Sequence, residues 1–307
     1  MGHPIRMFGA NDCWFITVRN FQARKLMCPS SELVREVCGG VLARAAKKYN
    51  VKLYGYVFLS NHVHLIIGAR GVGIAAFMQY LLSNLARKLS PLCRPRWWGR
   101  FWERRYSAAP ILDEPSLEHV LRYVVSHGVK EGLVASTREW EGLHCASQLV
   151  DEAPRRFKWF DWTKRWTARQ AAGPQSPWPD AYAAQFAEDE VLELAPLPQW
   201  QRVPPLERQA AAARLVRDVE LLHRKKQVLG MKAVKRESTD PPTHRKRAVR
   251  PMCHTLSATT RKQHRDDYWA FAREFHIASR DWRKGLVKVE FPAICFKPFV
   301  STELQIV

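Results

Sequence analysis

Two apolar segments of the chain, residues 51–59 and 62–69, are separated only by Ser60 and Asn61. Both segments are rich in β-branched and aromatic residues, which favours strands. So short a connection can only turn the second strand back beside the first, because a parallel crossover needs a dozen residues or more. The sequence therefore predicts an antiparallel hairpin, and every neighbouring element has to be arranged around it.

Strands and helices alternate on both sides of this hairpin. Before it, the pattern predicts a strand at 12–19 and a helix that starts after the cap Ser30 or Ser31 and ends near Lys48. After it come a helix at 74–89, a strand or extended segment at 101–112 and a helix from Pro115 to about His127. The order β-α-β-β-α-β-α predicts an α+β fold with a ferredoxin-like, or RRM-like, antiparallel sheet.

The rest of the chain has a different composition. Residues 141–200 hold six prolines and five tryptophans, and we interpret them as a long connection with short helices. Amphipathic helices are expected at 204–228 and 260–280, and a strand at 286–291. Residues 201–250 carry 14 Lys and Arg against five Asp and Glu. This division predicts a mainly helical, basic C-terminal region.

The whole chain is strongly basic, with 49 Lys and Arg against 29 Asp and Glu and a net charge of +20. A folded chain with such an excess usually binds a polyanion, most often nucleic acid. There is no stretch of 18 apolar residues and no apolar run of signal-peptide length near the N-terminus. We therefore expect no membrane partner and a cytoplasmic, nucleoid-associated location. The seven scattered cysteines form no CxxC pair, which argues against a zinc ribbon.

Four side chains stand out as candidates for chemistry. His62 and His64 are two residues apart in a predicted strand, so both imidazoles project from one face of the sheet and can share a metal ion. Tyr123 and His127 are four residues apart in a predicted helix and also share a face. Taken alone, the histidine pair could be structural or incidental. Taken alone, Tyr123 could be an ordinary core residue of an amphipathic helix.

Three motifs in this region resemble one family. Residues 54–64 read YGYVFLSNHVH and resemble the HUH signature of single-tyrosine transposases, more narrowly that of the REP-associated tyrosine transposases. Residues 100–106, RFWERRY, are similar to the Phe-Trp-Glu segment of that family. Residues 121–134, LRYVVSHGVKEGLV, are similar to its segment around the tyrosine, and Trp140 follows at the usual distance. The resemblance covers about residues 10–145.

The chain departs from the family pattern at two places. Ser60 stands where proline is common, and His127-Gly128 stands where Asn-Pro is common. Histidine is a better ligand than asparagine for most transition metals, so the second departure is compatible with a metal site.

The resemblance implies a metal-dependent transposase or endonuclease that acts on single-stranded DNA with a hairpin beside the cut. It makes Tyr123 the catalytic nucleophile, which forms a 5′-phosphotyrosine link. It makes His62 and His64, with His127 as a third ligand, the site for Mg²⁺ or Mn²⁺. The expected division is then a catalytic domain at 1–140, a Trp/Pro-rich connector at 141–200 and a DNA-binding region at 201–307. The chain is expected to act as a monomer or a homodimer.

Arginine and tryptophan alternate just before the third helix, where residues 94–105 hold five Arg and three Trp in twelve positions. Basic groups bind the phosphates of a single strand and tryptophans stack on its bases. The predicted DNA-binding residues are Arg87, Lys88, Arg94, Arg96, Arg100, Trp102, Arg104 and Arg105, with Trp97 and Trp98 also available for stacking.

Other function classes fit less well. A metal hydrolase of the HxHxD type needs a carboxylate two residues after the second histidine, where this chain has Ile66. An RRM-like binding protein needs aromatic residues where His62 and His64 stand. The alternative that stays open is a degenerate, domesticated member of the same family that binds nucleic acid without cutting it.

Overall fold

The predicted hairpin is present at the centre of a four-stranded sheet. The structure is a computed structural model that describes residues 5–7, 13–69, 73–93, 95–173, 185–225, 227–235, 251–286, 288–293 and 295–296. The strands are β1 (Cys13–Arg19), β2 (Lys52–Phe58), β3 (His62–Gly68) and β4 (Ser107–Pro110). Their order is β2-β3-β1-β4 and every pair is antiparallel, which confirms the ferredoxin-like α+β fold.

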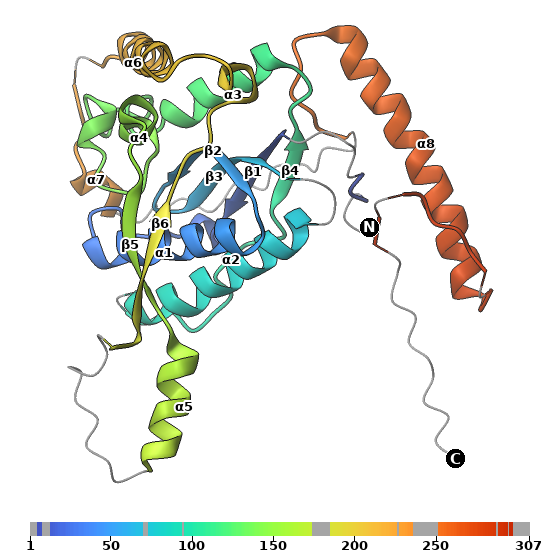
Figure 1. The fold of residues 1–307 in the computed structure, drawn as a ribbon, viewed down its shortest axis with the longest axis horizontal. Helices are drawn as coiled ribbons and strands as arrows, with labels where there is room; N and C mark the ends of the chain where they lie inside the picture. The colour runs from blue at the N-terminus through green and yellow to red at the C-terminus, as the bar shows by residue number, and fades with distance from the viewer. Residues whose placement is uncertain are drawn as a thin grey trace.

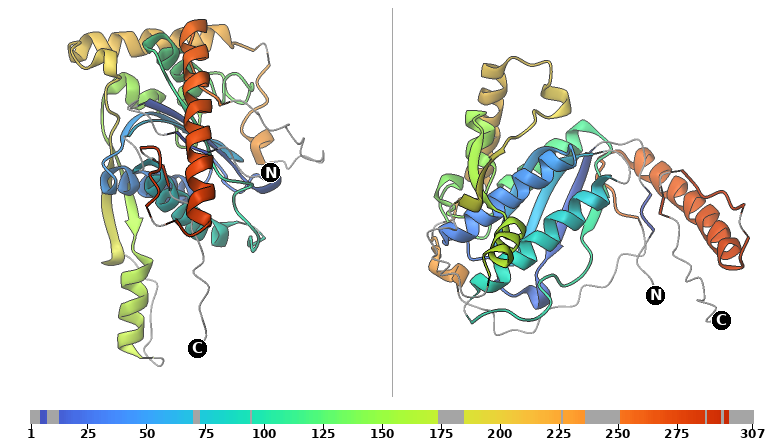
Figure 2. Two further views of the ribbon diagram at one scale, coloured as in Figure 1. Left: turned by 90° about the vertical axis from the view of Figure 1, so that its right-hand side faces the viewer. Right: turned by 60° about the horizontal axis from the view of Figure 1, so that its bottom comes forward.

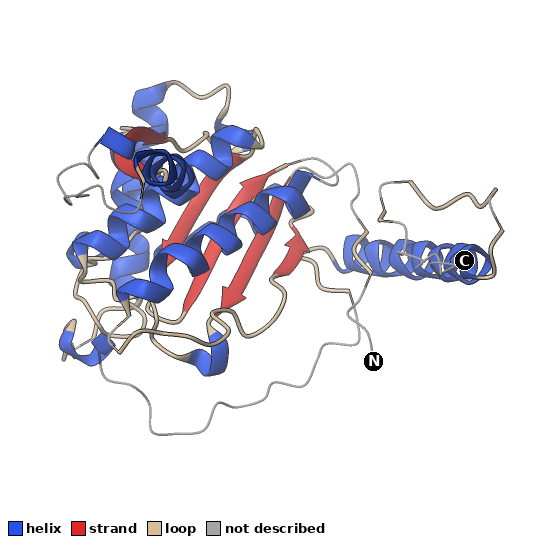
Figure 3. Ribbon diagram, turned by 90° about the horizontal axis from the view of Figure 1, so that it is seen from below, coloured by secondary structure: helices blue, strands red, loops and turns tan. Residues whose placement is uncertain are grey.

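Helices cover both faces of this sheet (Figures 1 and 3). The first two, α1 (Glu32–Lys48) and α2 (Gly73–Leu89), lie against one face, and α3 (Glu114–Val125) lies against the other. The start of α1 follows the sequence signal, because the Ser31 hydroxyl accepts a hydrogen bond from the Val34 amide at 3.3 Å. The cap of α3 is Asp113, whose carboxylate accepts from the Ser116 amide at 2.8 Å.

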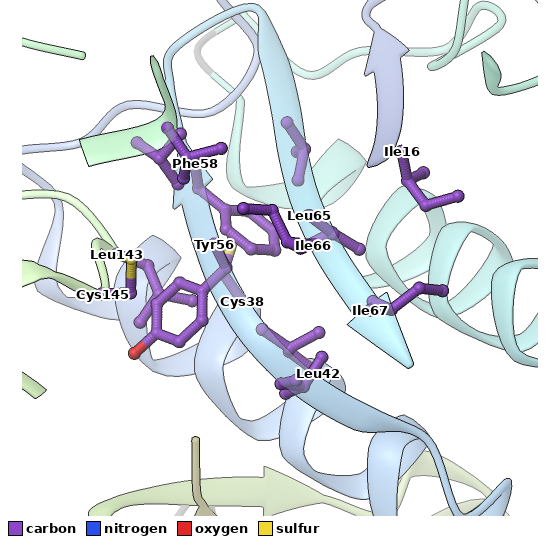
Figure 4. Close-up of a cluster of buried hydrophobic side chains, with 14 of the residues drawn as sticks. Ile16, Cys38, Leu42, Tyr56, Phe58, Leu65, Ile66, Ile67, Leu143 and Cys145 are labelled. Atoms are coloured by element: carbon purple, nitrogen blue, oxygen red, sulfur yellow. The ribbon is translucent and has the colours of Figure 1, made fainter. Parts of the chain in front are cut away.

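Side chains along β3 alternate between the two faces of the sheet. Val63, Leu65 and Ile67 are buried towards α1 and α2, whereas His62 and His64 project towards α3. Figure 4 shows how closely β2 and β3 pack with α1 in this core. The face that holds the two histidines is thus fixed by the burial of their apolar neighbours, because a shift of one residue would expose the whole apolar set.

Residues 141–200 are more regular than the composition predicts. They contain α4 (Ala146–Asp151), β5 (Arg155–Phe160), α5 (Trp162–Ala172) and β6 (Ala187–Leu192), and β5 and β6 pair as an antiparallel hairpin. The interpretation as a connection with short helices missed these strands. Phe157 and Trp159 of β5 are buried and alternate with exposed basic residues, which is a period-two pattern that was present in the sequence.

Two glycines of α1 allow this hairpin to approach the helix. A Cβ atom on Gly39 would lie 2.4 Å from the Phe157 ring, and one on Gly40 would lie 2.4 Å from the Lys158 carbonyl oxygen. Arg44 of α1 strengthens the contact, because its guanidinium lies 2.8 Å from Glu188 and 2.6 Å from Glu190 of β6. The hairpin therefore packs directly against α1.

We expect Gly40→Ala to destabilise the fold by about 1–3 kcal/mol, the usual cost of overpacking, because a backbone oxygen has to move. The matched control is Gly73→Ala, where a Cβ meets nothing within 4 Å. Urea unfolding followed by circular dichroism compares the two variants. A Gly40→Ala protein as stable as the control would show that the hairpin does not rest on α1 as closely as described.

The C-terminal region contains α6 (Pro205–Leu222), α7 (Lys232–Lys235) and α8 (Ala258–Arg283). α6 ends earlier than the expected residue 228, and it packs against α3 and α4 through buried residues that include Leu215 and Val219. α8 lies to one side of the sheet (Figures 1 and 2). Short 3₁₀ turns occur at Phe21–Ala23, Ser90–Leu92, Thr137–Glu139 and Pro198–Trp200.

The expected strand at 286–291 is wrong for the residues of that segment that the structure describes, which form no strand. They follow α8, and Phe291 packs on Phe275 and Trp282 of that helix instead of on a sheet edge. The outer edge of the sheet, next to β4, is occupied by another segment, because His254 forms a parallel β-bridge with Ile111. No helix in the described ranges is long and apolar enough to cross a membrane.

Candidate active site

Three histidines meet on the face of the sheet that α3 covers. The ring centres of His62 and His64 are 4.8 Å apart, and that of His127 lies 5.8 Å and 4.7 Å from them. Each residue offers one ligand atom, and the three atoms lie within 4.8 Å of one another. The structure thus brings together the three residues that the sequence places on a strand and on a helix.

Tyr123 lies beside this cluster. Its ring centre is 4.7 Å from that of His127 and 5.4 Å from that of His64. The side chain is 41% exposed, whereas the buried core tyrosines reach at most 8%, among them Tyr106. A tyrosine of the helix core would be sequestered from substrate, and Tyr123 is not.

The end of α3 places His127. The helix ends at Val125, so His127 lies in the turn that follows and not within the helix as expected. Its Nδ1 lies 2.9 Å from the Tyr123 carbonyl oxygen and 3.3 Å from that of Val124, two carbonyls of the last helical turn. Gly128 follows with a φ of +90°, which proline cannot adopt. The His-Gly pair is therefore suited to this turn.

Hydrogen bonds to Nδ1 orient all three imidazoles. In His127 this nitrogen must donate, because its partners are carbonyl oxygens. In His62 it donates to the Asn61 side-chain oxygen at 2.6 Å, and in His64 it lies 2.9 Å from the Thr17 hydroxyl. Donation from Nδ1 leaves Nε2 with a free lone pair, the state in which imidazole binds metal.

The environment keeps these imidazoles neutral. Burial is the main cause, and it lowers the pKa of His62 to about 4, with smaller contributions from Arg19 and Lys130. Burial, then Lys130 and His62, lowers the pKa of His127 to about 3. The pKa of His64 is also well below its usual range, through burial first and then the charges of its neighbours. At neutral pH the three imidazoles are consequently uncharged, and each has one ring nitrogen that carries a lone pair.

Strand β1 supplies two site residues that sequence reasoning missed. Thr17 pairs with His64 in the β1–β3 register and contacts its Nδ1. Phe15 stacks on His64 with ring centres 5.2 Å apart and meets the edge of Tyr123 at 6.0 Å. The alternation of β1 places both on the site face, but which histidine they meet depends on a pairing between distant segments.

Most of the predicted DNA-binding residues are exposed, but one of them is buried in contacts within the protein. Arg87, Arg96, Arg100, Arg104 and Arg105 are exposed, and Arg94 lies outside the described residues. The prediction for Lys88 needs correction, because its side chain is buried under the β5–β6 hairpin. Its ammonium donates to the Phe160 carbonyl oxygen and lies 4.1 Å from the centre of the Trp159 ring. A lysine held there is not available to a DNA strand.

The Arg/Trp segment reaches the sheet at the end that holds His62. The Glu103 amide donates to the Arg19 carbonyl oxygen at 2.9 Å, and Arg19 pairs with His62 across β1 and β3. Trp102 is anchored there, with its indole N–H donating to the Leu82 carbonyl at 2.9 Å. Trp98 is 78% exposed, with the Arg96 guanidinium 4.0 Å from the centre of its ring, whereas Trp102 is half-buried.

Parts of the chain are similar to proteins of known structure. Two solved structures share parts of it: the REP-associated tyrosine transposase bound to a REP hairpin (16% identity, 49% of this chain and 86% of that chain, TM-score 0.41) and a protein of Deinococcus radiodurans R1 described as a transposase (18% identity, 40% and 95%, TM-score 0.29). No curated protein matches the chain.

A family model, "Transposase IS200 like", matches residues 17–127. The matched range begins at Thr17 and ends at His127, so it includes the end of β1, the other three strands of the sheet, both histidines of β3 and the tyrosine of α3. This match confirms the family resemblance drawn from the three sequence motifs. Residues 17–127, which hold the histidine cluster and the neighbouring tyrosine, are thus similar to the IS200-like transposases.

Proposed function

We propose that the protein is a metal-dependent transposase, or endonuclease, that cleaves and rejoins single-stranded DNA beside a hairpin through a 5′-phosphotyrosine link. The observation that carries the proposal is the exposed Tyr123 in ring contact with His64 and His127, the two buried members of a cluster of three histidines. A nucleophile beside a set of metal ligands is the arrangement that phosphodiester cleavage needs.

The histidines suit a divalent cation. The Nε2 atom of His64 is buried and has no hydrogen-bond partner among the described residues, which is costly for a polar atom unless a ligand such as a metal ion binds it. His62, His64 and His127 would hold Mg²⁺ or Mn²⁺, and three imidazoles favour Mn²⁺ by ligand type. When bound, such an ion polarises an oxygen of the scissile phosphate.

Tyr123 performs the covalent step in this proposal. Its oxygen attacks phosphorus, an O–P bond forms and the bond from phosphorus to the 3′ oxygen breaks. The phenolic proton is lost to solvent, and the leaving 3′ oxygen takes up a proton. One phosphodiester replaces another, so the step is reversible without ATP, and the chain has no GxxxxGK[ST] loop to bind ATP.

The test is incubation with a hairpin oligonucleotide that carries a label on the 3′ side of the cut. Formation of a labelled band at the mass of a protein–DNA adduct on a denaturing gel is expected only with Mg²⁺ or Mn²⁺ present. A protein that binds the hairpin but never forms the adduct would instead be the degenerate binder, the second function that the sequence leaves open.

We propose that the DNA reaches the site along the exposed arginines at 96–105 and Trp98, and that the basic C-terminal region at 201–307 binds the hairpin. A truncation near residue 196 would not test the second part, because Leu197, Leu215 and Val219 are buried and their loss would uncover the core. Point substitutions on the exposed side of α6 are the sharper test.

We expect Arg214→Ala/Arg217→Ala to weaken hairpin binding without affecting adduct formation on a short oligonucleotide. Both arginines are exposed on α6. Each lost phosphate contact flattens the log–log dependence of affinity on salt by about 0.7 to 0.9, so the slope should fall by about 1.4 to 1.8. The matched control is Lys47→Ala/Lys52→Ala, which removes two exposed charges near α1 and β2. Equal slopes for the two variants would remove α6 from the interface.

A further inference from the structure

Lys130 places a positive charge inside the candidate metal site. Its ammonium nitrogen lies 3.1 Å from Nε2 of His127 and 3.8 Å from the centre of the Tyr123 ring. The side chain is only 23% exposed, and its nearest carboxylate, that of Glu131, is 3.5 Å away. Lys130 is not among the site residues predicted from the sequence, yet it contacts both Tyr123, the proposed nucleophile, and His127, a proposed metal ligand.

The direction of the hydrogen bond between Lys130 and His127 follows from the role of the other ring nitrogen, Nδ1. Nδ1 of His127 donates to backbone carbonyls, so Nε2 carries the lone pair and the ammonium must be the donor. That lone pair is the one that a metal ion needs. The ammonium of Lys130 and a divalent cation therefore compete for the same atom.

We propose that Lys130 is a resident cation of the histidine cluster, which metal binding displaces from His127 and which then supports the negative charge that develops at Tyr123 and the phosphate. The inference rests on the proposed function. Two cations cannot share one lone pair, and they repel each other strongly at contact distance in a buried site. The flexible stem of lysine lets the ammonium leave His127 while it stays beside Tyr123.

This arrangement predicts two effects of opposite sign. Without Lys130, the metal no longer displaces a hydrogen-bonded ammonium or approaches a neighbouring positive charge, so metal affinity should rise. The covalent step should become slower, because the cation over the Tyr123 ring is missing. A residue that only maintained the local fold would lower both quantities together.

The first measurement is Mn²⁺ binding to the full-length protein in the absence of DNA, followed by the electron paramagnetic resonance signal of free Mn²⁺. Lys130→Met is expected to bind Mn²⁺ on the order of tenfold more tightly than the unmodified protein, the scale of one charge-assisted hydrogen bond. The matched control is Lys52→Met, which removes the same charge from an exposed position at the opposite end of β3 from His62. It should leave Mn²⁺ affinity unchanged.

The second measurement is the rate of adduct formation in a single turnover at saturating Mn²⁺, where a fall of about tenfold is expected for Lys130→Met. Lys130→Arg keeps a cation and should recover most of the rate. Circular dichroism verifies folding, and Lys130→Gln replaces the Met variant if that one does not fold.

The inference about Lys130 would be overturned if a folded Lys130 variant bound Mn²⁺ no more tightly than the unmodified protein. The proposed function would still stand in that case, provided that the unmodified protein forms the adduct and that its Mn²⁺ binding depends on His62. Mn²⁺ binding that does not depend on His62 would overturn both.

Discussion

Tyr123→Phe is expected to bind hairpin DNA with unchanged affinity and to form no covalent adduct. The substitution removes only the hydroxyl group, and the ring contacts with Phe15, His64 and His127 can persist. Because the oxygen that would attack phosphorus is absent, the loss should be complete and not gradual. A denaturing gel with labelled DNA measures the adduct, and a filter-binding or mobility-shift titration measures affinity.

The matched control for this prediction is Tyr106→Phe, which removes the hydroxyl of a buried tyrosine in the motif at 100–106. It should retain adduct formation. An adduct in the Tyr123→Phe variant, or its loss in the Tyr106→Phe variant, would place the nucleophile elsewhere and contradict the assignment.

His62→Ala and His64→Ala are each expected to abolish cleavage. EDTA should stop the unmodified protein, and Mn²⁺ or Mg²⁺ should restore it. His62 and His64 come from one strand and supply two of the three ligand atoms that lie within 4.8 Å of one another. Loss of either leaves a site with too few ligands to hold the ion against water. Cleavage assays over a range of metal concentrations measure the effect.

His127→Ala should weaken metal binding by about 10–100-fold, the scale seen when a supporting interaction around a metal is lost. His119→Ala is the control, since His119 is exposed on α3 and lies eight residues before His127 in the chain. If the two variants had the same metal dependence, His127 would not be a ligand, and the site would consist of the two strand histidines completed by water or by Asn61.

Much of the site could be predicted because it depends on short-range periodicity. His62 and His64 share a face in any strand, and residues four apart such as Tyr123 and His127 remain neighbours even though the helix ends at Val125. The order of strands and helices follows from the hairpin and from helix caps such as Ser31. These features are local, so the chain has few ways to satisfy them.

Other parts depended on which distant segments pack together. The pairing of Thr17 with His64 is set by the β1–β3 register, and the burial of Lys88 is set by the β5–β6 hairpin. Nothing in the composition of residues 141–200 showed that this hairpin would dock on α1, which requires the bare Cα atoms of Gly39 and Gly40. Such contacts cannot be read from one segment, because each needs the three-dimensional position of another.

The sequence by itself thus determined the order of the strands and helices as far as His127, the face that carries the two histidines and the resemblance of residues 17–127 to the IS200-like transposases. Only the tertiary structure brought the histidines of β3, the tyrosine of α3 and Lys130 to one place. The physical reason is that periodicity decides which side of its own element a residue occupies, whereas packing of α3 on the sheet decides what that side faces. The competition between Lys130 and a metal ion is a property of that packing.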